Sequence, residues 1–219
     1  MINKIVTLVS LVMWLLAFNA NAAYDGTIRV YQGSGFSYGN GGEFQAVTSG
    51  LGTFQTFCIE ENENFSPGSV YNYRINTGAV KGGAGANATD PFTGNSMDNI
   101  SIGTAWLYSQ FRDGTLHDYD STKAGVLQNA IWYLENEKAG EFNNPYVILA
   151  EFELRLTDEQ IRADSQGAYG VKALNLCDGT GNVVQDQLAI VVPEPTTLIA
   201  GALLLLPFGI STFRIVRRK

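Results

Sequence analysis

Aromatic and β-branched residues, partly alternating with polar ones, fill four short segments in the first third of the chain. Gly- and Ser-rich pieces separate these segments as turns. The pattern predicts β-strands at 27–31, 42–47, 53–60 and 70–75. The next stretch, 81–96, reads KGGAGANATDPFTGNS and has little hydrophobic content, so we expect a flexible loop there.

Helical periodicity then replaces the strand pattern. Apolar residues recur three and four positions apart within 100–112, 118–137 and 145–163, which predicts three helices. In the second helix one apolar stripe is formed by Ala124, Leu127, Ile131 and Leu134. Gln128 borders this stripe, and a neutral amide that loses water there needs a hydrogen-bonding partner.

The strand pattern returns near the end of the helical region. The segments 170–178 and 185–192 are two such runs, and the hairpin-type turn DGTGN separates them. The order of strands, helices and strands predicts an α+β domain, with a β-rich sandwich or barrel-like body and a helical insert. We assign this domain to residues 23–191.

The amino-terminal end differs from domain material. Lys4 is followed by a long apolar run, and the run closes with the small-x-small triplet Ala20-Asn21-Ala22. This is the layout of a cleavable secretory signal peptide, so we expect residues 1–22 to direct export.

The carboxy-terminal segment, 192–219, has three parts in a fixed order. Pro193-Glu194-Pro195 precedes the uncharged apolar stretch 196–213, and the chain ends with the basic residues Arg214, Arg217, Arg218 and Lys219. The stretch is long enough to cross a bilayer as a transmembrane helix, with the basic end in the cytoplasm.

This tail resembles the PEP-CTERM sorting signal of Gram-negative bacteria that produce exopolysaccharide. The resemblance implies a precursor anchored in the inner membrane and processed by an exosortase, a membrane transpeptidase that cleaves near the Pro-Glu-Pro triplet. The mature protein would then reside in the cell envelope, at the surface or in the extracellular matrix. A simple membrane anchor is the alternative.

The charge of the exported part excludes one class of partner. Of the 14 Lys and Arg residues five lie outside 23–195, whereas all 21 Asp and Glu residues lie inside, which leaves a net charge of −12. Such a surface repels nucleic acids, so we expect no nucleic-acid partner.

Familiar catalytic groupings are absent from the sequence. The one histidine, His117, lies in a polar loop, and no Ser-His-Asp or Cys/His set can be assembled around it. We therefore expect no enzyme, no cofactor and no metal. Acidic residues do cluster, at Glu60, Glu61 and Glu63 and again at Asp118 and Asp120. A solvated acidic edge and a helix cap are the simple interpretation; a glycan-binding or glycan-active domain is the alternative.

Two cysteines, Cys58 and Cys177, both lie in predicted strands. An even number of cysteines in an exported protein ordinarily suggests a disulfide. A structural matrix protein with a Cys58–Cys177 disulfide is therefore one interpretation.

The surroundings of Cys58 favour another. Thr56-Phe57-Cys58-Ile59-Glu60 and the later helical stretch Leu127-Gln128-Asn129-Ala130-Ile131-Trp132 together resemble the thioester domains of bacterial surface adhesins. The resemblance implies a covalent bond between Cys58 and Gln128. It also implies that Phe57, Ile131 and Trp132 form a dry pocket around that bond, which would slow hydrolysis.

The chemistry of such a crosslink is plausible. A thiolate is a good nucleophile and a carboxamide a poor electrophile, so the two must be held in contact for the thiolate to expel ammonia. An amine- or hydroxyl-bearing ligand, such as an exopolysaccharide, could then take the acyl group. The sequence thus predicts a non-enzymatic surface or matrix protein made for covalent attachment.

Overall fold

The computed structural model describes residues 24–38, 41–80 and 86–192. The predicted signal peptide, the Pro-Glu-Pro triplet, the expected membrane span and the terminal basic residues lie outside the described residues. Within the described part of the chain, no helix combines the length and the apolar character that crossing a bilayer requires.

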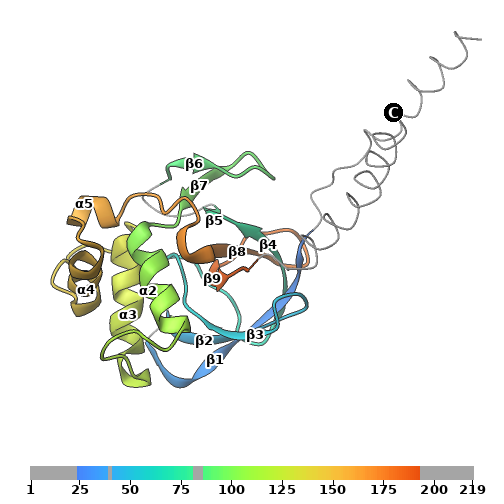
Figure 1. Cartoon of the computed structure of the whole chain (residues 1–219). Coiled ribbons are helices and arrows are strands. Elements are labelled where there is room, and N and C mark those ends of the chain that lie inside the picture. Colours follow the sequence, from blue (N-terminus) through green and yellow to red (C-terminus); the bar gives the residue numbers. More distant parts are fainter. Residues whose placement is uncertain (1–23, 39–40, 81–85, 193–219) are drawn as a thin grey trace, which may run out of the picture.

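A six-stranded antiparallel sheet forms the body of the protein (Figure 1). Its strands are β1 (Gly26–Tyr38), β2 (Gly41–Thr48), β3 (Thr53–Thr56), β4 (Val70–Asn76), β8 (Val171–Cys177) and β9 (Gln187–Ile190). The spatial order is β3-β2-β1-β4-β8-β9, so strands from both ends of the chain share one sheet. All six predicted strand segments contribute to it.

The two edges of this sheet meet. Residues 57–59 continue from β3, and Cys58 forms an isolated antiparallel bridge with Gln187 at the start of β9. The Leu188 amide donates to the Phe57 carbonyl oxygen at 3.1 Å, and the Ile59 amide donates to the Asp186 carbonyl oxygen at 3.2 Å. These bonds close the sheet into a barrel-like body, one of the two architectures predicted from the sequence.

A second, three-stranded sheet lies beside the barrel. It consists of β5 (Gly78–Val80), β6 (Ala88–Thr89) and β7 (Ser96–Asn99), in the order β5-β7-β6. The expectation of a loop throughout 81–96 is therefore wrong for β6 and the start of β7. The local cause is Asp90, whose carboxylate accepts hydrogen bonds from the Phe92 and Thr93 amides and so builds the turn between the two strands.

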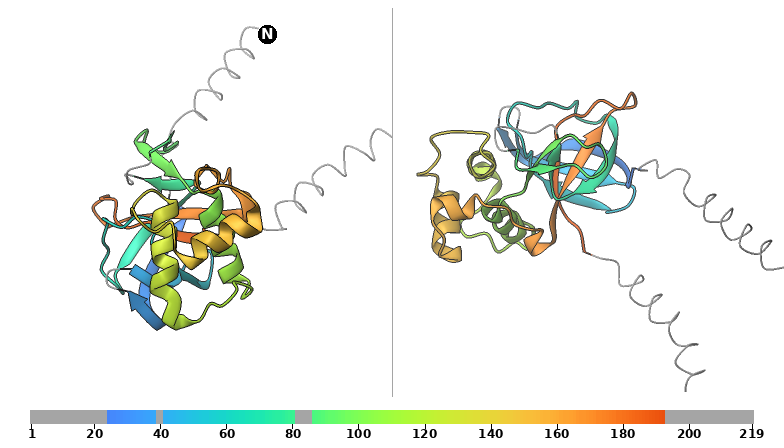
Figure 2. Two further views of the ribbon diagram at one scale, coloured as in Figure 1. Left: turned by 90° about the vertical axis from the view of Figure 1, so that its left-hand side faces the viewer. Right: turned by 90° about the horizontal axis from the view of Figure 1, so that it is seen from above.

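The helical insert packs against one side of the barrel (Figures 1 and 2). It contains α2 (Ile102–Arg112), η1 (Ser121–Lys123), α3 (Ala124–Leu134), α4 (Pro145–Leu154) and α5 (Asp158–Ile161), and η2 (Ala168–Gly170) leads into β8. The third predicted helix is divided in two. Arg155 adopts a left-handed conformation with φ of 55° and ends α4, after which Thr157 starts α5 with a capping box.

Two apolar cores lie on opposite sides of the strand that carries Cys58. Phe57 and Ile59 belong to the core between the barrel and the helices, whereas Cys58 belongs to the core inside the barrel. This follows from the alternation of side chains along an extended chain. Trp132 of α3 also packs in the barrel core, so this helix reaches the surroundings of the cysteine.

Candidate functional site

Cys58 is fully buried where the two edges of the sheet meet. Loss of hydration on burial raises the pKa of its thiol to about 12, while a hydrogen bond from Gln187 acts in the opposite direction and the negative charge of Glu60 reinforces the rise. At neutral pH a free Cys58 would therefore be a thiol, which is a poor nucleophile toward solvent reagents.

Gln128 lies on α3 beside the predicted apolar stripe, whose four members are all fully buried. Its Oε1 accepts hydrogen bonds from the amides of Cys58 and Gly42, both at 3.1 Å. Its Nε2 donates to the Cys58 carbonyl oxygen at 2.8 Å. The side-chain amide therefore satisfies both backbone groups of Cys58, as a residue of a neighbouring strand would.

Two glycines allow β2 to approach this part of α3. A Cβ atom at Gly41 would lie 2.7 Å from the Trp132 ring and 2.9 Å from Cγ of Gln128. Gly42 has φ of 113°, a value that L-residues with a side chain rarely adopt. Glycine at these two positions is therefore required for the hydrogen bond between the Gly42 amide and Gln128.

A second glutamine lies against the sulfur. Gln187 is fully buried, and its Nε2 lies 3.5 Å from Cys58 Sγ. Because Cδ is bonded to Nε2 at about 1.33 Å, the distance from Sγ to the carboxamide carbon is at most about 4.8 Å. The two residues are bridge partners in the closed sheet, so their side chains project to the same face.

Two different glutamines contact Cys58, whereas the sequence pointed only to Gln128. Gln128 is brought to Cys58 as predicted, but its described hydrogen bonds join it to the backbone of residues 42 and 58. Gln187, which the sequence analysis did not single out, has its amide beside the thiol. A signal for it exists in the sequence, since it is a carboxamide that begins the otherwise apolar run QLAIVV of a predicted strand.

The three predicted pocket residues are divided between the two cores. Trp132 shares the barrel core with Cys58, and its indole ring packs against Gly41. Phe57 and Ile131 pack in the core between barrel and helices. They therefore lie on the opposite side of the Cys58 segment from the thiol, whereas Leu174 and Leu176 of β8 and Ala189 of β9 belong to the core that contains the thiol.

A Cys58–Cys177 disulfide is excluded by the sheet geometry. Both residues are free thiols. Cys58 pairs with Gln187, which pairs with Leu174, and Cys177 lies three residues farther along β8. At ~4.8 Å per strand and ~3.3 Å per residue, the two Cα atoms are roughly 14 Å apart, whereas a disulfide needs less than about 7 Å.

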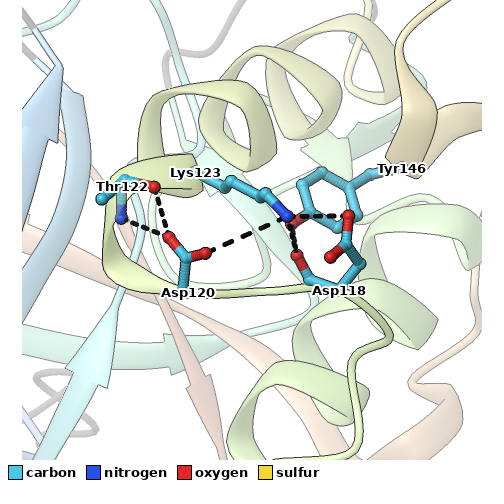
Figure 3. A network of polar contacts seen from close by, with 5 residues as sticks. All are labelled: Asp118, Asp120, Thr122, Lys123 and Tyr146. Carbon is cyan, nitrogen blue, oxygen red and sulfur yellow. Dashed lines mark hydrogen bonds and ion pairs between the residues drawn. The ribbon is translucent and has the colours of Figure 1, made fainter.

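The acidic residues have structural partners. Glu60 is buried, and its Oε2 accepts from Gln185 Nε2 at 2.9 Å, while Glu61 forms an ion pair with Lys138 at 2.8 Å. Asp118 and Asp120 both face Lys123 (Figure 3).

Asp120 also caps η1 by accepting from the Thr122 amide at 2.8 Å. The predicted helix cap is therefore present, and the exposed His117 lies next to this cluster. Among the described residues, no group of three or more His, Cys, Asp or Glu side chains is arranged to bind a metal ion.

Buried carboxyl groups make the stability of this fold pH-dependent. Burial raises the pKa of Asp186 to about 8 and that of Glu135 to about 7, and it also raises the pKa of Glu60. The folded state then binds more protons than the unfolded state between pH 4 and 8, so stability falls as pH rises through this window. We expect unfolding to require about 1–3 kcal/mol less at pH 8 than at pH 5, as measured by urea denaturation.

The Glu135→Gln variant should show a flatter pH profile, because it keeps an acceptor for the Ser101 hydroxyl but cannot titrate. Glu153→Gln, at an exposed position of α4, is the matched control and should leave the profile unchanged. A free energy of unfolding that rises from pH 5 to pH 8 in the wild type would contradict the assignment of these carboxyl groups.

Comparisons with known proteins add one finding. No protein-family model matches this chain, and no curated protein matches it in sequence. The chain is structurally similar to the N-terminal thioester domain of fibronectin-binding protein SfbI from Streptococcus pyogenes, with a TM-score of 0.45 and 15% sequence identity. The match covers 80% of this chain and 97% of that chain.

Proposed function

We propose that this chain is an exported surface or matrix protein that carries an internal thioester between Cys58 and Gln187. One observation carries the proposal. Nε2 of the fully buried Gln187 lies 3.5 Å from Sγ of the fully buried Cys58, where the two edges of the sheet meet. Such contact supplies the effective concentration that a poor electrophile needs.

The bond forms by a balanced substitution. Sγ of Cys58 bonds to Cδ of Gln187 while the bond from Cδ to Nε2 breaks, and the thiol proton leaves with the nitrogen as ammonia. Gln128 has a positioning role, because its amide fixes the backbone of Cys58 and so the direction of the thiol. This assignment replaces the sequence-based expectation that Gln128 is the acyl donor.

Acyl transfer leaves the ligand attached through Gln187. When an amine or hydroxyl attacks the thioester carbonyl, a new amide or ester bond to Cδ of Gln187 forms, the bond from Cδ to sulfur breaks, and the Cys58 thiol is released. Burial, which raises the pKa of that thiol to about 12, keeps it protonated at neutral pH.

The ends of the sequence support a location for this activity. A cleavable signal peptide over 1–22 and a sorting tail over 192–219 imply export, an inner-membrane precursor and processing by an exosortase. The acceptor is then an amine or hydroxyl at the cell envelope or in the exopolysaccharide matrix. Cleavage near Pro193-Glu194-Pro195 releases the domain from its anchor.

Intact mass spectrometry of the protein recovered from an exopolysaccharide-producing host tests both the thioester and the removal of the sorting tail. We expect a carboxyl terminus near residue 195 and a mass about 17 Da below that calculated, because ammonia has left. Incubation with methylamine should then add about 31 Da, which a disulfide would not permit. A full calculated mass without methylamine uptake would refute the thioester, and an intact tail would refute the processing.

A further inference from the structure

The Thr56 hydroxyl lies beside Oε1 of Gln187, the oxygen that would become negative when an amine attacks the proposed thioester. Thr56 is fully buried, and its Oγ1 lies 3.4 Å from Oε1 of Gln187. Its short hydrogen bond, at 2.7 Å, goes to the Leu188 carbonyl oxygen. A hydroxyl has a single hydrogen, so Thr56 can serve one of these oxygens at a time.

A neighbouring phenol makes the hydrogen of Thr56 available. Tyr108, on α2, is fully buried, and its hydroxyl lies 3.0 Å from the Leu188 carbonyl oxygen and 2.8 Å from the Gln55 carbonyl oxygen. Arg112, one turn later, reaches the Gln55 carbonyl oxygen with Nη1 at 3.5 Å. Each acceptor in this group therefore has an alternative donor.

The alternatives permit a concerted shift of hydrogen bonds. Arg112 donates to the Gln55 carbonyl oxygen, the Tyr108 hydroxyl turns to the Leu188 carbonyl oxygen, and the Thr56 hydroxyl turns to Oε1 of Gln187. No buried carbonyl group is left without a donor, so the shift avoids the cost of an unsatisfied polar group. Arg112 Nη1 also lies 3.3 Å from the Tyr108 hydroxyl, so a positive charge borders this group of hydrogen bonds.

We propose that Thr56 is the oxyanion donor of the Cys58–Gln187 site and that Tyr108 is the positioning residue that frees its hydroxyl. The inference rests on the proposed thioester. When an amine attacks the thioester carbonyl, the carbonyl electron pair moves to Oε1, and Thr56 donates to that oxygen. The pair then returns, the bond from carbon to sulfur breaks, and the sulfur takes the proton of the amine.

The rate of methylamine cleavage, followed by intact mass, tests Thr56. Removing one oxyanion donor typically slows a reaction by about 100- to 1,000-fold, so Thr56→Val should show a loss of that size. Thr56→Ser keeps the hydroxyl and should react within a few-fold of the wild type. Thr53→Val, at an exposed position of the same strand, is the matched control and should react at the wild-type rate.

The cleavage rate of the Tyr108→Phe variant is a second test, which still applies if Thr56→Val does not form the thioester. Without the phenol, the Thr56 hydrogen stays with the Leu188 carbonyl oxygen, and cleavage should slow by about 5- to 10-fold. A wild-type cleavage rate in Thr56→Val would overturn the oxyanion role of Thr56 and leave the thioester proposal standing. If Thr56→Val does not form the thioester, a wild-type cleavage rate in Tyr108→Phe would do the same. A wild type without the mass deficit would refute the thioester itself.

Discussion

The Gln187→Ala variant is expected to have its full calculated mass and to take up no methylamine. Without a carboxamide at this position Cys58 has no acyl donor, and the thiol remains free in the barrel core. Cys58→Ala should give the same result, because it removes the nucleophile. Intact mass before and after methylamine treatment measures both losses, which should be complete.

One further variant and a digest make this result specific. Cys177→Ser should keep the mass deficit of about 17 Da. Cys177 lies three residues along β8 from Leu174, the residue that pairs with Gln187, so it is not part of the Cys58–Gln187 contact. Fragment masses of a digest made under conditions that preserve the thioester should join the peptide of Cys58 to that of Gln187. A mass deficit that persists in Gln187→Ala would return the role of acyl donor to Gln128, as the sequence first suggested.

Local patterns predicted the part of the site that depends on local structure. The apolar stripe of α3 placed Gln128 on a buried helix face, and the alternation around Cys58 placed that residue in a strand. Helix and strand periodicity decide which side of an element a residue occupies. Gln128 is buried on α3, and Cys58 lies two residues after the end of β3, in an isolated β-bridge with Gln187. The proximity of Cys58 and Gln128 was expected because two short stretches together resemble thioester domains. In the structure the Cys58 amide donates to Oε1 of Gln128 at 3.1 Å.

The role of Gln187 depends on pairing between distant segments, which local patterns do not specify. The sheet closes because residues 57–59 bond to a strand that begins about 130 residues later. Strand pairing at such separation is set by the whole topology, and a shift of one residue would turn Gln187 to the other face. For the same reason the sequence could not distinguish a contact with the backbone of Cys58 from a contact with its sulfur.

Gln128→Leu should be among the most destabilising single substitutions in this protein. Leucine matches the size and apolar surroundings of the side chain but leaves the amides of Cys58 and Gly42 and the Cys58 carbonyl oxygen without partners. Each buried backbone group left unsatisfied costs about 1–3 kcal/mol, and partial relaxation lowers the sum, so we expect a loss of about 3–6 kcal/mol. Urea denaturation measures this difference.

The measurement is sharpest in a Cys58→Ala background, in which no variant can form the thioester. The loss then reports hydrogen bonding alone, because the crosslink is absent from both parent and variant. Gln45→Leu makes the same chemical change at an exposed position of β2 and should stay within about 0.5 kcal/mol of the parent. A Gln128→Leu variant as stable as the Gln45→Leu control would show that the backbone of Cys58 is held by other groups. It would then remove the positioning role that explains why this helix carries a buried glutamine.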